Sequence, residues 1–141
     1  MDMDTIEMQP MTAFLADTRI TMTASQVDDN PNMDDESRQS MDHWRCVFHL
    51  GRKRMAIFFS MGRGHNGREP ELGDVLDCLA SDAASVDNAD TFDAWAAEYG
   101  YDTDSRRHER TYKTCVRQRD RLRAFLGEDQ YQRLLWNTAR M

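Results

Sequence analysis

The residues with the clearest potential for chemistry lie in the segment from Met61 to Arg68, which carries three glycines and two arginines. The segment follows a predicted strand and precedes a helix that can begin near Pro70. A strand, a glycine-rich loop and a helix N-terminus are the parts of many phosphate sites. The segment matches neither a P-loop nor a dinucleotide fingerprint, which both require a parallel βαβ unit. The pattern therefore favours a turn with residues at positive φ, and phosphate contact by Arg63 and Arg68 is the alternative.

The cysteines and histidines do not predict a metal site. Cys46 and His49 are three residues apart on a predicted strand, so their side chains point to opposite faces. No second pair stands at zinc-like spacing. We predict that Cys46, Cys78 and Cys115 are small, buried apolar residues in their reduced form.

The sequence singles out no catalytic group. A nucleophilic pair across the fold, for example Cys115 with a histidine, has no local support. The carboxylates are plentiful, but none lies in an apolar setting that would raise its pKa. We therefore predict no enzymatic activity, no catalytic residue, no metal and no cofactor.

Charge is sorted along the chain into blocks. Residues 1–42 hold ten acids and two bases, and residues 43–68 hold six bases and no acid. Residues 69–104 hold eleven acids and no base, and residues 105–141 hold ten bases and four acids. Such blocks either pair with one another on the surface of the fold, or at least one of them faces a partner.

The second interpretation gives two sets of candidate contacts. An acidic run can imitate a phosphate backbone or occupy a basic groove, whereas a basic hairpin, loop or helix can contact phosphates. The candidate partner-binding acids are Asp74, Asp77, Asp82, Asp87, Asp93 and Glu98. The alternative phosphate or nucleic-acid contacts are Arg52, Lys53, Arg54, Arg63, Arg68, Arg106, Arg110 and Lys113.

Strands are predicted in the first half of the chain. Residues 18–26 alternate and are rich in β-branched residues, which predicts one strand. Residues 43–50 and 55–61 are apolar runs around the turn Gly51–Arg54, which predicts a β-hairpin. Residues 27–40 are too polar to pack and predict a solvated loop. Residues 1–17 predict a flexible N-terminal tail in which Met11 could be an alternative start.

Helices are predicted in the second half. Apolar residues recur at helical spacing from Pro70 to about residue 85. A shorter helix is predicted between a cap at Asp90 and a stop at Gly100. A long third helix is predicted between a cap at Asp102 or Thr103 and Gly127, and a final helix follows it. Residues 18–141 thus predict a single α+β domain, a short antiparallel sheet of one hairpin plus an N-terminal strand, covered by three to four helices.

Composition indicates where in the cell this domain works and which partners it can have. The net charge of −7 opposes wholesale non-specific binding to nucleic acid, although it leaves room for a local basic site. Three widely spaced cysteines argue against a secreted disulfide framework. No apolar run approaches the roughly 20 residues of a membrane helix, and the acidic start is unlike a signal peptide. We predict a cytoplasmic protein with no membrane association.

About half of the chain, from Ser60 to Gly127, resembles a group of small proteins of bacteriophages and prophages, especially those of actinobacteria. The residues that carry the resemblance are Ser60-Met-Gly62, Gly64-His65, Asp74 to Asp82, Phe92, Trp95, Tyr99 to Ser105 and Glu109 to Lys113. The resemblance implies an accessory role in which a small acidic protein inhibits a host defence complex, as anti-CRISPR proteins do.

Two functional hypotheses follow. The first is a non-enzymatic interaction protein of the bacterial host cytoplasm that inhibits a host protein or ribonucleoprotein, a CRISPR effector, through its acidic helices. The second is a small nucleic-acid-binding module that uses the basic hairpin turn and the Gly/Arg loop, with the third helix as an additional contact.

Overall fold

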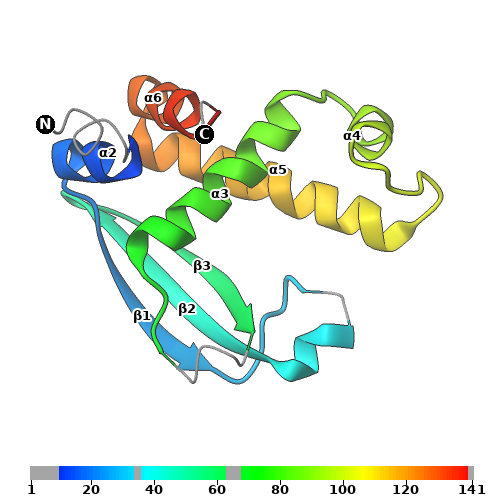
Figure 1. Ribbon diagram of the computed structural model, residues 1–141, viewed down its shortest axis with the longest axis horizontal. Coiled ribbons are helices and arrows are strands. Elements are labelled where there is room, and N and C mark those ends of the chain that lie inside the picture. The colour runs from blue at the N-terminus through cyan, green and yellow to red at the C-terminus, as the bar shows by residue number, and fades with distance from the viewer. Residues whose placement is uncertain (1–9, 34–35, 63–67, 140–141) are drawn as a thin grey trace, which may run out of the picture.

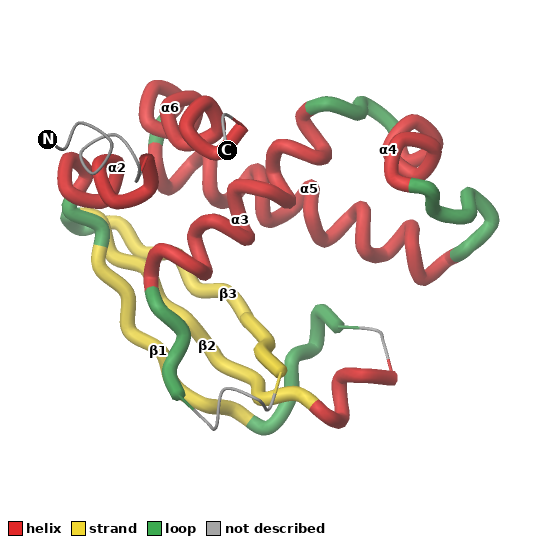
Figure 2. Tube along the Cα trace, viewed as in Figure 1, coloured by secondary structure: helices red, strands yellow, loops and turns green. Residues whose placement is uncertain are grey.

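The computed structural model describes residues 10–33, 36–62 and 68–139 (Figure 1). Within these ranges a three-stranded antiparallel sheet is combined with five α-helices and one 3₁₀ turn, which confirms the predicted α+β class. Figure 2 shows the strands side by side, with α3 drawn across the sheet and α2, α4, α5 and α6 beyond it. The elements are α2 (Pro10–Thr18), β1 (Thr21–Val27), η1 (Glu36–Ser40), β2 (Met41–Leu50), β3 (Lys53–Gly62), α3 (Leu72–Asp87), α4 (Phe92–Tyr99), α5 (Arg106–Leu126) and α6 (Glu128–Ala139).

The sheet has the order β1-β2-β3 and is centred on the predicted hairpin. Leu50 pairs with Lys53, so the turn contains only two residues, and Gly51 adopts a φ of 60°. Lys53 and Arg54, which the sequence assigned to the turn, are therefore the first residues of β3. The predicted N-terminal strand is β1, which runs antiparallel to β2 with Thr21 opposite His49.

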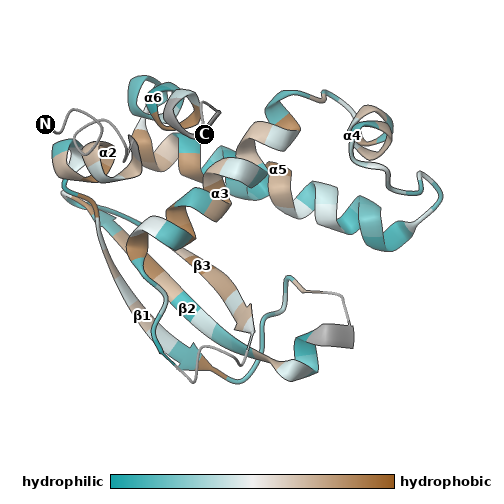
Figure 3. Cartoon of the chain, in the orientation of Figure 1, coloured by the Kyte–Doolittle hydropathy of each residue, from teal (hydrophilic) through white to brown (hydrophobic). Residues whose placement is uncertain are grey.

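One face of the sheet forms the core. Trp44, Cys46 and Phe48 alternate along β2 and are buried at 4% exposure or less, as their period of two predicts. They pack with Leu76 of α3 and Leu122 of α5 in a single apolar cluster. In Figure 3 the strands carry brown hydrophobic residues among teal hydrophilic ones, whereas the N-terminal part of α5 is mostly teal.

The helix starts differ from the predicted caps. Thr91, not Asp90, caps α4, since its hydroxyl accepts from the Ala94 N–H at 3.1 Å. Ser105 caps α5 by accepting from the His108 N–H at 3.2 Å. Asp102 is engaged in a preceding turn, in which it accepts from the Asp104 N–H, so the helix begins beyond it.

The helix ends follow the glycines. Gly100 ends α4 with a φ of 75°, and Gly127 ends α5 with a φ of 83°. Both values lie in the region that a residue with a side chain adopts only at a cost. These two stops are confirmed as predicted.

The predicted tail over residues 1–17 is wrong from Pro10 onward. This segment forms α2, in which Phe14 is fully buried against the main core and Met11 and Leu15 pack beside it. Met11, Phe14 and Leu15 stand at i, i+3 and i+4, which is an apolar stripe of one helix. Asp17 pairs with Arg133 of α6, so α2 is fastened to the other end of the chain.

Two smaller expectations also change. Cys78 of α3 is exposed rather than buried. The polar segment 27–40 is not simply a solvated loop, since Asn30 is buried and η1 lies within it. Asn30 donates to the Ser60 hydroxyl at 2.9 Å, so polar bonds hold this segment against the sheet.

Candidate functional site

Three predicted acids converge on one face of α3. Asp74, Asp77 and Asp82 surround Cys78 within about two turns of the helix. Although Cys78 is exposed, the surrounding protein partly desolvates its thiol and raises its pKa, and the charge of these three carboxylates raises it further. The thiol therefore stays protonated, and its surroundings repel anions. Asp74, Asp77 and Asp82 thus give this side of α3 a negative charge, and we call it the acidic face.

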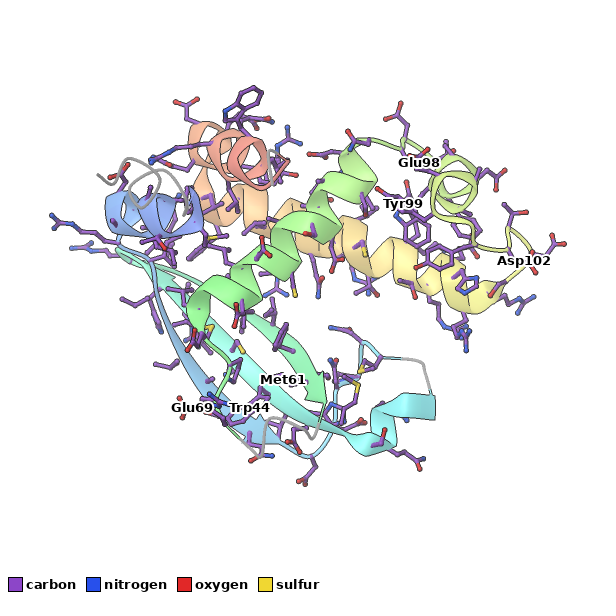
Figure 4. The ribbon with its side chains drawn as sticks, viewed as in Figure 1. Trp44, Met61, Glu69, Glu98, Tyr99 and Asp102 are labelled. Carbon is purple, nitrogen blue, oxygen red and sulfur yellow. The ribbon has the colours of Figure 1, made fainter. Side chains whose placement is uncertain are left out.

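Beside this face, aromatic side chains gather around Trp95. Tyr101 stacks on Trp95 with ring centroids 5.0 Å apart, and Tyr99 packs against it at 5.9 Å. Gly100 makes this possible, because its positive φ reverses the chain between the two tyrosines. Trp95 is buried, but Tyr99 and Tyr101 are 46% and 43% exposed. Figure 4 shows Tyr99 and Glu98 at the end of α4 and Asp102 on the loop that follows.

The two features share one hollow of about 530 Å³ between α3, α4 and α5, which we call the acidic aromatic hollow. Asp82 lines it together with Trp95, Tyr99 and Tyr101. Asp82 keeps contact with solvent, yet the surrounding protein desolvates it and raises the pKa of its carboxyl to about 6. The buried Cys115 also lines the hollow, and burial followed by the charge of Asp82 raises the pKa of its thiol to about 12.

The other predicted acids separate into two kinds. Asp87 is a structural residue, since it accepts from the Arg119 guanidinium at 3.0 Å and from the Tyr131 hydroxyl at 2.6 Å. It ties α3 to α5 and α6 and offers no free oxygen to a partner. Asp93 and Glu98 are exposed on α4, and Asp93 lies in the first turn, where the helix dipole favours a negative charge.

The predicted cations lie on several elements of the fold. Arg52, Lys53 and Arg54 are exposed at the hairpin end of the sheet, whereas Arg106, Arg110 and Lys113 lie on the N-terminal half of α5. Arg63 and most of the Gly/Arg loop lie outside the described residues. Arg68 is exposed ahead of α3. The loop therefore supplies only Arg68 to any interface that the described residues can define.

Sequence reasoning did not find a second hollow, of about 470 Å³, between the segment that follows β1 and α5. We call it the basic hollow, because Arg38, Arg110, Lys113 and Arg117 line it. Arg38 stands in an acidic stretch of the sequence, so only the fold shows that it meets α5. Its guanidinium donates to the Met33 carbonyl at 3.1 Å and pairs with Asp29 at 3.4 Å.

A hydrogen-bonded serine and histidine lie at the end of the sheet. His43 Nε2 donates to the Arg38 carbonyl at 2.8 Å, which leaves Nδ1 to accept from the Ser60 hydroxyl at 2.7 Å. Asn30 donates to the same hydroxyl. The carboxylate that orients the histidine in a hydrolase triad is here a main-chain carbonyl. The arrangement fastens the segment 27–40 to the sheet.

Comparison with known proteins yields no relative. Neither a protein-family model, nor a curated protein, nor a solved structure matches the chain. In the part of the chain that the structure describes, no helix has the length and apolar character needed to cross a bilayer. Over the same residues no three metal-ligating side chains converge on one point. The case for function therefore depends on the surfaces themselves.

Proposed function

We propose that this protein is a non-enzymatic interaction protein that binds a basic surface of a host defence complex, a CRISPR effector, and blocks it. The observation that carries the proposal is the acidic aromatic hollow, in which Asp82 lies beside Trp95 and two exposed tyrosines. The resemblance to phage accessory proteins gives the biological setting.

The hollow suits a cationic side chain of the partner. A guanidinium or ammonium group that enters it meets the Asp82 carboxylate and the faces of aromatic rings, which attract cations. Tyr99 and Tyr101 supply large, rigid contact area at little entropic cost, and tyrosine is enriched among the residues that dominate binding energy. Asp74 and Asp77 extend the negative surface next to the hollow and steer a basic partner toward it.

Internal pairing is the competing explanation of the acidic block, and it accounts for only part of it. Asp87 is consumed by Arg119 and Tyr131. Asp74, Asp77 and Asp82 form no salt bridge to any described residue. A set of like charges kept together without counter-ions costs stability, which favours a role outside the fold.

The test is inhibition of target cleavage by a purified CRISPR effector from an actinobacterial host. The variant Asp74→Lys/Asp77→Lys reverses two charges on the acidic face, and Tyr99→Ala/Tyr101→Ala empties the rim of the hollow. We expect each variant to lose at least tenfold in inhibitory potency while keeping its unfolding midpoint near that of the wild type. The matched control Asp28→Lys/Asp129→Lys reverses two exposed acids elsewhere and should retain full potency.

The pH dependence offers a second readout. Because the pKa of Asp82 is about 6, its carboxylate becomes protonated as the pH falls from 7 to 5, so binding of a cationic partner should weaken over this range. Asp82→Asn should bind more weakly at pH 7 and show a flatter profile. If the wild type inhibits no effector, or if the acidic-face variant and its control behave alike, the proposal is wrong.

A further inference from the structure

Five basic residues lie along one exposed face of α5, from Arg106 to Arg121. Along the chain they are four, three, four and four residues apart, so at 100° per residue their side chains fall within an arc of about 80° around the helix. Over 15 residues the row is about 22 Å long at 1.5 Å per residue. We call this row the α5 track, and its members are Arg106, Arg110, Lys113, Arg117 and Arg121.

The track continues onto the hairpin at one end. The Arg121 guanidinium donates to the Ala56 carbonyl of β3 at 2.6 Å, which holds this end of the track against the sheet. Arg121 also lines a hollow of about 440 Å³ together with Lys53 and Arg54. The hairpin cations and the helix cations, which are remote in sequence, therefore meet at Arg121.

Along its middle the track forms one wall of the basic hollow. Lys113 and Arg117 line that hollow opposite Arg38. Among the described residues Lys113 has no acidic partner, and Arg117 donates only to the Thr114 hydroxyl. These two positive charges are therefore not neutralised within the fold.

Other arginines of the same helix show what internal pairing looks like. Arg119 is paired with Asp87 and Asp120, and Arg123 forms two hydrogen bonds to Glu128 at 2.7 and 3.0 Å. Arg119 and Arg123 are thus neutralised by carboxylates within the fold, whereas Lys113 and Arg117 of the track are not. The acid Asp120, which lies beside the track, is taken up by Arg119.

We propose that the α5 track binds the phosphodiester backbone of nucleic acid without reading its sequence. The row of positive charges is about 22 Å long, which exceeds the length of the phosphate group of a single nucleotide. Because one DNA strand carries one phosphate per about 3.4 Å of helix axis, the row covers about six phosphates. The exposed tyrosines that would stack on bases belong to the acidic aromatic hollow, not to the track. Duplex DNA should be preferred over a single strand because its charge density along the axis is twice as high.

The site is independent of the acidic aromatic hollow, so the two proposals can fail separately. The experiment is fluorescence anisotropy with a labelled 20-base-pair duplex of arbitrary sequence and with a single strand of equal length. If Lys53, Arg54, Lys113, Arg117 and Arg121 each neutralise one phosphate, the slope of log K against log salt is about −4.5. Affinity should then fall roughly 500-fold between about 50 and 200 mM salt.

The decisive variant is Lys113→Gln/Arg117→Gln, which should reduce the salt slope by about two and weaken binding to every sequence alike. The control Arg19→Gln/Arg45→Gln removes two exposed charges on other elements and should leave the slope unchanged. Both variants alter only exposed side chains, and matching unfolding midpoints verify that they fold. Absence of binding near 50 mM salt, equal slopes for the two variants, or displacement of the duplex by pyrophosphate at the same phosphate concentration would overturn the proposal.

Discussion

Replacing Tyr131 with phenylalanine tests how the three longest helices are held together. Tyr131 is fully buried in α6, and its hydroxyl donates to Asp87 of α3, which also receives the Arg119 guanidinium of α5. The variant keeps the ring and its packing and removes one hydrogen bond to a carboxylate. Such bonds contribute about 1.5–3 kcal/mol. The Asp87 side chain is 23% exposed and keeps Arg119, so water can replace part of the loss. The expected cost is therefore about 1.5–2 kcal/mol.

The assay is urea denaturation followed by circular dichroism, in which a loss of this size lowers the midpoint by about 1 M at a slope near 2 kcal/mol per M. The matched control is Tyr99→Phe, whose side chain is 46% exposed, and it should change stability by less than about 0.5 kcal/mol.

An alkaline titration gives a second readout. Burial, reinforced by the hydrogen bond to Asp87, raises the pKa of Tyr131 well above its usual range. One of the four tyrosines should thus stay protonated until the protein unfolds, and Tyr131→Phe should abolish that delayed step. A variant as stable as the Tyr99→Phe control would refute the idea that Asp87 joins the helices.

Three further predictions concern other parts of the fold. Phe14→Ala should lower the free energy of unfolding by about 3–5 kcal/mol in denaturant titrations, because the ring is fully buried. The control Thr12→Ala, on the exposed side of α2, should leave stability unchanged. Equal effects of the two variants would mean that α2 is not part of the core. Gly100→Ala should cost about 1–2 kcal/mol through backbone strain alone, since open space surrounds the added methyl group, and an unchanged midpoint would contradict the positive φ. Asp82 has a pKa raised from 3.8 to about 6, so the folded state takes up a proton before the unfolded state does, and the free energy of unfolding should increase as the pH falls from about 6 to 4. Asp82→Asn should lack this increase, and parallel pH profiles for the two proteins would argue against a desolvated carboxylate.

Local signals predicted most of the fold. The two apolar runs around Gly51 specified a hairpin, and period-two alternation placed Trp44, Cys46 and Phe48 on its buried face. Gly100 and Gly127 marked helix ends because few other residues adopt their backbone angles. The caps were predicted less well, since Asp90, Thr91, Asp102 and Ser105 are all good capping residues and only the path of the chain selects among them.

The candidate site was predicted only in part. The acidic block pointed to α3, where Asp74 and Asp82 are exposed and Asp77 is half-buried, but their contact with a partner stays a prediction. The same reasoning could not exclude Asp87, because its partners Arg119 and Tyr131 come from helices 32 and 44 residues further along the chain.

The cations show the same limit. Arg38 and Arg121 were not among the candidate residues, since their neighbours in sequence are not their neighbours in space. The sequence shows which segments are acidic or basic, whereas tertiary contacts determine which charged side chains are left without a partner in the fold.

The contact between α2 and α6 has a consequence for how the chain folds. Asp17 and Arg133 are 116 residues apart in sequence, and Phe14 lies under the Arg133 guanidinium at 5.6 Å from its ring centre. During synthesis, α2 therefore leaves the ribosome long before α6 exists, so the part of its apolar stripe that α6 covers stays exposed until then, while Met11 and Leu15 also lie beside Gly73 of α3. Closing so long a loop is entropically slow, so docking of α2 should be a late step that completes a core already assembled from the hairpin, α3 and α5.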